Sequence, residues 1–228
     1  MNALASPEVG EYLNEHFVSS FQKVGTFQIV GQQKQGGNVA SYFCAPDGRV
    51  LHVVAGPVDA DTMLREARWV VDTVRQALDE YEKTGKSFKG LVRVAHADRL
   101  AREHGLKVEP VVFDAPPSAD QSALSYRDPS GRPLAPILPP PPIEGPDVSF
   151  NFAGQEAARK SAGAREVLDR GGRRWVLGNQ GQVHMLLAAH SMQRIEVLYG
   201  SVFEGILGEK VSTKPVVIAT PFPWVAMR

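Results

Sequence analysis

The chain has 228 residues, with 25 acidic and 25 basic side chains and one cysteine. It is long enough to bury a proper core, and its formal net charge of zero gives no general electrostatic reason to expect nucleic acid or an anionic membrane as a partner. No apolar run approaches the roughly 20 residues that span a bilayer. The first residues lack the pattern of a signal peptide, so the default location is the cytoplasm unless a leader precedes Met1.

The first thirty-seven residues predict a helix, one or two strands and a loop. The helix covers residues 1–13 and restarts at Ser6, which suits an N-cap, with Pro7 at the first helical position. Loose alternation over residues 17–30 predicts one or two strands around Gly25. The polar, Gly-rich stretch 32–37 predicts a loop.

Residues 38–81 are the most legible part of the chain and predict strand, turn, strand and helix. Residues 38–44 and 49–55 are rich in β-branched and aromatic side chains, and Ala45-Pro-Asp-Gly48 between them is a turn, so the pair predicts a β-hairpin. Asp59 or Asp61 can cap the helix that follows. Its apolar positions recur at helical spacing and predict a helix lying across the hairpin: Met63, Ala67, Val70, Val71, Val74 and Leu78.

A second helix is predicted over residues 88–104, ending at Gly105. Eleven prolines then occur between residues 110 and 146, and they predict an extended linker of polyproline II character over residues 109–150. The linker is interpreted as a semi-rigid spacer or as a strap lying on the domain. The P-x-x-P spacing of Pro133, Pro136 and Pro139 leaves open a docking segment for an aromatic-lined groove.

Residues 151–228 predict a mainly helical C-terminal region. A charged helix is expected over 155–170, a short strand or packing anchor at Trp175 to Leu177, and a long helix over 182–207, broken near Ser191. The tail from Pro215 onward is expected to be extended. The apolar stripe of the long helix needs cover, and packing back onto the first domain is the default expectation, with a partner protein or self-association as alternatives.

Several phrases resemble the thioredoxin-like family. They are Ser6-Pro-Glu-Val9, then Leu13-Asn14, then Phe17-Val18, followed by the hairpin and helix of residues 38–81. The resemblance implies an α/β chain whose residues 1–108 form a thioredoxin-like three-layer α/β/α domain. It also implies that the Cys-x-x-Cys of that family would fall before Met1, so the domain is expected to be incomplete at its N-terminus.

The residues needed for disulfide exchange are not in the sequence. Such chemistry needs an attacking thiolate and a second cysteine, whereas Cys44 stands alone inside a strand and is read as a small buried hydrophobe, with a reactive thiol as the alternative. Gly36-Gly-Asn-Val39 occupies the place where the resembling family carries a cis-proline, and it contains no proline.

We therefore expect a redox-inactive module that binds protein or is structural. The alternative is a thiol–disulfide oxidoreductase with its cysteines upstream, and a third hypothesis is a scaffold that acts through its Pro-rich stretch.

The sequence predicts no catalytic residue, no cofactor and no metal site. His184 and His190 are six residues apart, about 120° away from a shared helix face, and are not a metal pair. His96 and His104 could share a face, but a structural role is preferred for them. The carboxylates of the helix after the hairpin are assigned to caps and solvated faces: Asp59, Asp61, Glu66 and Asp72. The partner considered is another protein, and the oligomeric state is left open.

Overall fold

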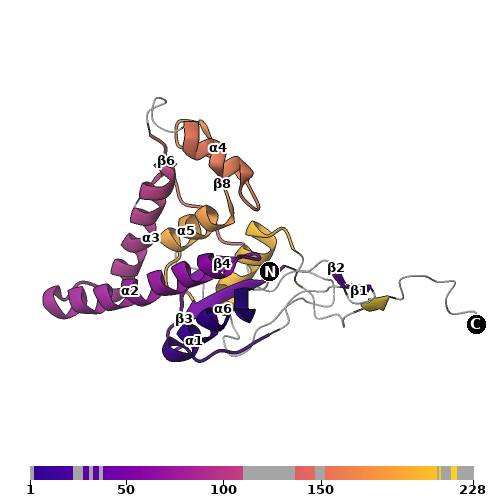
Figure 1. The fold of residues 1–228 in the computed structure, drawn as a ribbon. Coiled ribbons are helices and arrows are strands. Elements are labelled where there is room, and N and C mark those ends of the chain that lie inside the picture. Colours follow the sequence, from indigo (N-terminus) through magenta and orange to yellow (C-terminus); the bar gives the residue numbers. More distant parts are fainter. Residues whose placement is uncertain are drawn as a thin grey trace, which may run out of the picture.

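The computed structural model shows a mixed α/β chain (Figure 1). The residues that it describes are 3–22, 28–30, 33–35, 38–109, 137–146, 152–209, 211 and 217–219. Among them, no helix combines the length and the apolar character that crossing a membrane requires.

Runs of strands and runs of helices follow one another along the chain. The α-helices are α1 Pro7–His16, α2 Ala60–Thr84, α3 Phe88–His104, α4 Phe152–Lys160, α5 Asn179–Ala189 and α6 Ile195–Gly200, with a 3₁₀ turn at Ala3–Ala5 and a π-helix, Ser201–Ile206, that continues α6. The strands are β1 Gln28–Val30, β2 Gln33–Gln35, β3 Ala40–Cys44, β4 Val50–Ala55, β5 Lys107–Val108, β6 Ile143–Glu144, β7 Arg165–Leu168, β8 Arg174–Leu177 and β9 Val217–Ala219. Antiparallel pairs join β3 to β4, β5 to β6 and β7 to β8, while β1 pairs with β2 antiparallel and with β9 parallel.

The β3–β4 hairpin lies between two buried clusters of side chains. The β-hairpin predicted over residues 38–55 is thereby confirmed. Gly48 has φ of 81°, which the turn requires and which glycine adopts without strain. All six residues of β4 are buried. Phe43 pairs with His52 while Cys44 pairs with Val50, so Leu51 is an extra residue in β4 and forms a β-bulge.

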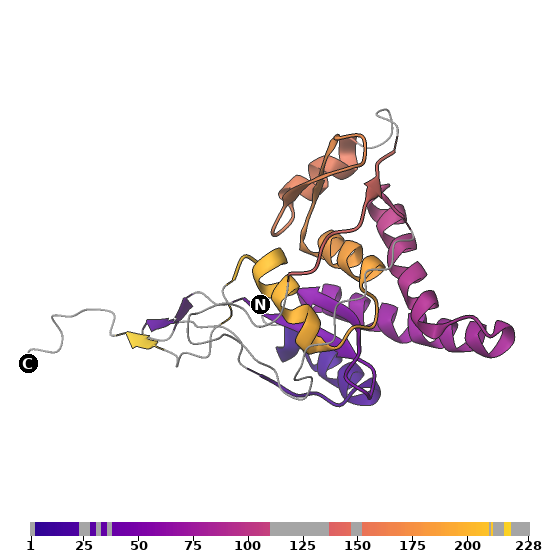
Figure 2. The ribbon, with the colours of Figure 1, turned by 180° about the vertical axis from the view of Figure 1, so that it is seen from behind.

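Helices cover both faces of this hairpin (Figures 1 and 2). On one face, Leu51 and Val54 join a buried cluster with residues of α1 and α2, among them Val9 and Met63. On the other face the cluster includes Leu138 of the Pro-rich stretch and residues of β4, α5, α6 and the π-helix, among them Val50, Val53, Val183, Leu187, Leu198 and Val202. The apolar stripe expected over 182–207 therefore packs back on the hairpin. Burial of both faces explains why every residue of β4 except His52 is apolar.

The two helices after the hairpin begin and end close to their predicted limits. The Asp59 carboxylate accepts a hydrogen bond from the Thr62 backbone N–H at 2.8 Å and caps α2. Gly105 ends α3 with φ of 71°, and Leu106 beyond it is buried. The break predicted near Ser191 separates α5 from α6.

Two predictions of local structure are wrong, and a third holds in part. Of the one or two strands predicted over 17–30, β1 forms at Gln28–Val30 while residues 17–22 form no strand. A strand, β2, replaces part of the loop predicted over 32–37. The helix predicted over 155–170 ends at Lys160, because the chain turns at Gly163 with φ of 68° and continues as β7. Strand β7 then pairs with β8, a partner that helical spacing in the sequence does not reveal. Of the predicted tail, only β9 lies within the described residues.

The described part of the Pro-rich stretch lies along the body as a strap. Leu138 and Ile143 are buried, and the Leu138 backbone N–H donates to Ser201 Oγ at 2.8 Å. Strand β6 pairs with β5 at the end of α3. Residues 110–136 and 147–151 lie outside the described residues, so the boundaries of the linker and of the flanking regions stay predictions.

Candidate functional site: a buried histidine cluster

Three histidines from three different elements meet in the interior. His52 comes from β4, His96 from α3 and His184 from α5, and all three side chains are fully buried. The centroids of their rings lie 5.1 to 5.5 Å apart. One ring nitrogen of each lies within 4.8 Å of the others. We call these residues the histidine cluster.

The buried carboxylate of Glu66 connects the histidine cluster to an arginine. Glu66 is 1% exposed, and both of its oxygens accept from the Arg99 guanidinium at 2.6 Å. Its Oε2 also lies 3.0 Å from Nε2 of His52, and because a carboxylate accepts, that nitrogen carries the proton. The assignment of Glu66 to a solvated face is therefore wrong. It lies three residues after Met63 and four before Val70, on the buried face of α2.

Hydrogen bonds also fix the protonated nitrogen of His96. Its Nε2 lies 2.9 Å from the carbonyl oxygen of Leu51, which can only accept, so Nε2 is the donor and Nδ1 holds the lone pair of the neutral ring. That Nδ1 faces Nδ1 of His184 at 2.9 Å. Leu51 is the extra residue of the β-bulge and has no partner residue in β3, and its carbonyl oxygen accepts from the histidine cluster instead.

The environment keeps the three rings neutral and Glu66 ionised. Burial lowers the pKa of His52 and of His184, and it lowers that of His96 to about 3, with the nearby His52 as a further cause. Burial alone would raise the pKa of Glu66, but hydrogen bonds from His52 and Arg99 outweigh it and lower that pKa to about 2. At neutral pH the site therefore contains uncharged imidazoles beside a paired carboxylate.

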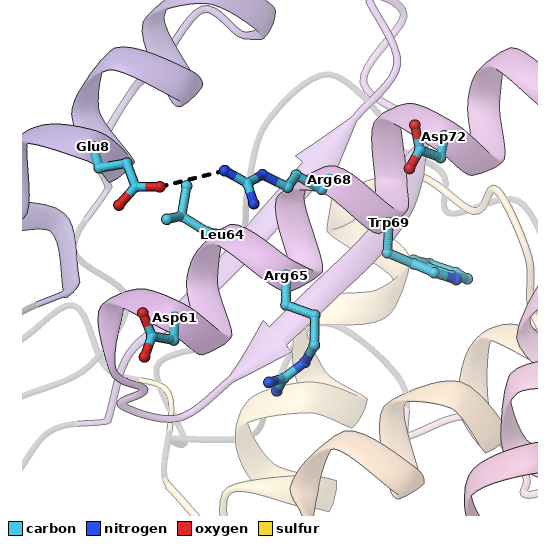
Figure 3. A pocket seen from close by; sticks show the side chains of 7 residues that line it. All are labelled: Glu8, Asp61, Leu64, Arg65, Arg68, Trp69 and Asp72. Atoms are coloured by element: carbon cyan, nitrogen blue, oxygen red, sulfur yellow. Dashed lines mark hydrogen bonds and ion pairs between the residues drawn. The ribbon is translucent and has the colours of Figure 1, made fainter.

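Trp69 of α2 closes the histidine cluster on one side. Its ring centroid lies 4.9 Å from that of His52, 5.0 Å from that of His96 and 5.4 Å from that of His184. Trp69 also borders a shallow surface hollow on α2, in which Arg68 reaches toward Glu8 while the Trp69 ring extends away from that ion pair (Figure 3). The half-buried indole thus separates the histidine cluster from this part of the surface.

The residues singled out from the sequence lie elsewhere. Cys44 is the last residue of β3 and is half-buried. Pro139 is exposed, and its carbonyl oxygen accepts a hydrogen bond from His190 Nε2 at 2.8 Å. Pro133 and Pro136 lie outside the described residues.

Sequence reasoning missed the histidine cluster because its members are far apart in the chain. It compared His184 with His190 and His96 with His104, pairs within one predicted helix, whereas the structure joins one member of each pair to His52. One signal was available: His52 stands between Leu51 and Val53 in a strand whose other residues are all apolar, and a polar residue buried in such a strand needs a partner.

Comparisons with known protein families, with curated proteins and with solved structures give no match for this chain. Its function must therefore be argued from its own residues.

Proposed function

We propose that the chain is a redox-inactive thioredoxin-like module that serves by binding another protein or as a structural unit. The observation that carries this proposal is the environment of Cys44, the sole cysteine. Burial, with the nearby Glu196 and Asp47 carboxylates, raises the pKa of its thiol to about 11. At pH 7 only about one thiol in ten thousand is then ionised, and disulfide exchange requires the thiolate.

The arrangement around the hairpin supports the thioredoxin-like part of the proposal. Strands β3 and β4 lead directly into α2, which packs on the same face as Val9 of α1. The family resemblance also implies further strands beside this hairpin. In the part of the chain that the structure describes, β3 and β4 pair with each other, and an isolated bridge joins Arg49 to Arg194. The support is therefore for the hairpin–helix half of such a domain.

A disulfide-reduction assay tests redox inactivity. With dithiothreitol and insulin as substrate, the chain should give no rate above that of dithiothreitol alone. The Cys44→Ser variant should behave identically. Reductase activity that survives Cys44→Ser and disappears on unfolding would overturn the proposal.

The second candidate is a thiol–disulfide oxidoreductase whose Cys-x-x-Cys precedes Met1. The phrase Ser6-Pro-Glu-Val9 favours it, because in the resembling family this phrase follows the redox motif, and here Ser6 and Pro7 begin α1. The intact mass and the N-terminal sequence of the protein from its native source distinguish the two. A chain that begins upstream with two cysteines would support the oxidoreductase.

A scaffold role for the Pro-rich stretch needs a test that leaves the buried part of that stretch in place. Deleting residues 133–142 would remove Leu138 from the core and its backbone N–H from Ser201, so loss of binding could follow from unfolding. Replacing Pro133 and Pro136 by alanine leaves that anchor in place. A scaffold role predicts that the double substitution abolishes partner binding while the thermal unfolding temperature is kept.

A further inference from the structure

We propose that His52, His96 and His184 form a binding site for one divalent transition-metal cation of the Zn²⁺ class. The site is independent of the function proposed above, because it shares no residue with the Cys44 environment. Four features carry the inference: the spacing of the ring nitrogens, the partners of the opposite nitrogens, the unpartnered lone pairs and the charge of the surroundings.

The spacing is close to that of a metal site. Zn²⁺ binds imidazole nitrogen at about 2.0–2.1 Å, which places neighbouring ligand nitrogens about 3.3–3.4 Å apart in a tetrahedral site. Nδ1 of His96 and Nδ1 of His184 lie 2.9 Å apart, and one nitrogen of all three rings lies within 4.8 Å of the others. The required separation falls between these two values, so small ring movements suffice to bring all three nitrogens to one ion.

Two of the three nitrogens facing away, those of His52 and His96, are held as they are in histidine metal sites. A metal-bound histidine usually donates its other N–H to a carboxylate or to a backbone carbonyl, which fixes the tautomer. Nε2 of His52 lies 3.0 Å from Glu66, and Nε2 of His96 donates to the Leu51 carbonyl at 2.9 Å. The Gln180 amide lies beside the same nitrogen of His52 but donates to the Val53 carbonyl at 2.8 Å, so Glu66 is the acceptor for His52. Lone pairs are then left on Nδ1 of both rings.

The histidine cluster also contains buried nitrogens without a partner. Among the described residues, Nδ1 of His52 and Nε2 of His184 make no hydrogen bond although both are buried. A buried polar atom without a partner is costly, and most such atoms in native proteins are paired. A cation held by the three rings would use the lone pair of His52 Nδ1, which the protein alone leaves unsatisfied. It would also replace the hydrogen bond between His184 Nδ1 and His96 Nδ1, with the proton of His184 moving to Nε2.

Charge and ligand type favour a borderline-soft cation. Neutral imidazoles suit Zn²⁺, Cu²⁺ or Ni²⁺, whereas Mg²⁺ and Ca²⁺ prefer oxygen ligands. Arg99 and the exposed Arg65, whose Nε lies 3.5 Å from Glu66, are matched by Glu66 and Glu103, so the nearest ionised groups sum to zero and oppose a cation with no net positive charge. Three protein ligands leave a fourth position on the ion.

Zn²⁺ titration of the chelator-treated chain, without a histidine tag, tests the site. We expect calorimetry to give one Zn²⁺ per chain and the thermal unfolding temperature to rise with bound Zn²⁺. The matched pair of variants is His96→Gln and His104→Gln, which lie eight residues apart on α3. His96→Gln should lose binding by at least a hundredfold, while His104→Gln should retain it.

A measurement on the unaltered chain keeps the proposal testable if His96→Gln fails to fold. X-ray absorption of the Zn²⁺-loaded protein should show a first shell with three imidazole nitrogens. Absence of uptake by the folded, chelator-treated chain would overturn the proposal. So would a first shell with fewer than three imidazoles, or binding that survives His96→Gln in a folded variant.

Discussion

Glu66 is the residue on which the polar interior depends. A single carboxylate on α2 accepts two hydrogen bonds from Arg99 on α3 and faces the ring of His52 on β4. Arg99 is 6% exposed, so neither charge of the pair is solvated. A buried ion pair of this kind contributes little more to the stability of the fold than apolar residues of the same volume would. Removing one partner, however, leaves the other charge buried without a counter-ion and without water.

Glu66→Gln should therefore lower the free energy of unfolding by about 3–5 kcal/mol. The amide keeps the volume of the side chain but removes the charge opposite Arg99. Urea denaturation followed by circular dichroism gives the value. Glu80→Gln is the control, because the Glu80 pair with Lys86 is exposed and should contribute about 0–1 kcal/mol. Equal effects of the two substitutions would contradict the importance given to burial.

The thiol of Cys44 gives a second prediction, on its pH dependence. Because burial raises its pKa to about 11, the thiolate fraction of the folded chain rises through the whole range from pH 7 to 10. Alkylation by iodoacetamide should accelerate about tenfold per pH unit over that range, whereas an ordinary thiol levels off above a pKa of about 8.5. The urea-unfolded chain is the control and should level off. A plateau below pH 9 in the folded chain would show an accessible, activated thiol.

The sequence correctly predicts the helices and strands that have capping or turn residues at their ends. Helix α2 has Asp59 before it and Gly85 after it, and the hairpin has its turn residues, so local chemistry sets their limits. Strand β7 is different: nothing within residues 165–168 favours strand over helix until β8 lies beside it. Secondary structure that depends on a partner cannot be determined from its own segment.

The cap of α2 can be tested by a pair of substitutions. Asp59→Ala removes the carboxylate that accepts from Thr62 N–H, and we expect the thermal unfolding temperature to fall by about 2–4 °C. Asp61→Ala, at the second residue of the same helix, removes an equal charge without removing the cap. Thermal unfolding of both variants is followed by circular dichroism. An equal fall in their unfolding temperatures would assign the effect to the lost charge alone.

At the scale of the whole molecule, the C-terminal segment completes the core of the N-terminal one. Val50 and Val53 of β4 are fully buried beneath residues of α5 and α6, and the histidine cluster takes one of its members from α5. The strap adds Leu138 to the same apolar cluster. Without the C-terminal segment, one face of the hairpin would expose its apolar side chains.

Residues 1–109 alone should consequently fail to fold cooperatively. The exposed face of β4 should bind a hydrophobic dye, and circular dichroism should show no sharp thermal transition. The full-length chain is the reference and should unfold in one transition. A truncated chain that melts cooperatively, near the temperature of the full chain, would instead support residues 1–108 as an independent domain.

The sequence by itself determined the hairpin, α2 and α3, because each is specified by side chains within a few residues of its ends. It also determined that these 228 residues contain one thiol, so no disulfide can form between two of them. Only the tertiary structure decided that Glu66 faces inward and that His52, His96 and His184 meet, across 44 and 88 residues of chain. Such contacts follow from how helices pack on the hairpin, and packing depends on surfaces that distant segments contribute jointly.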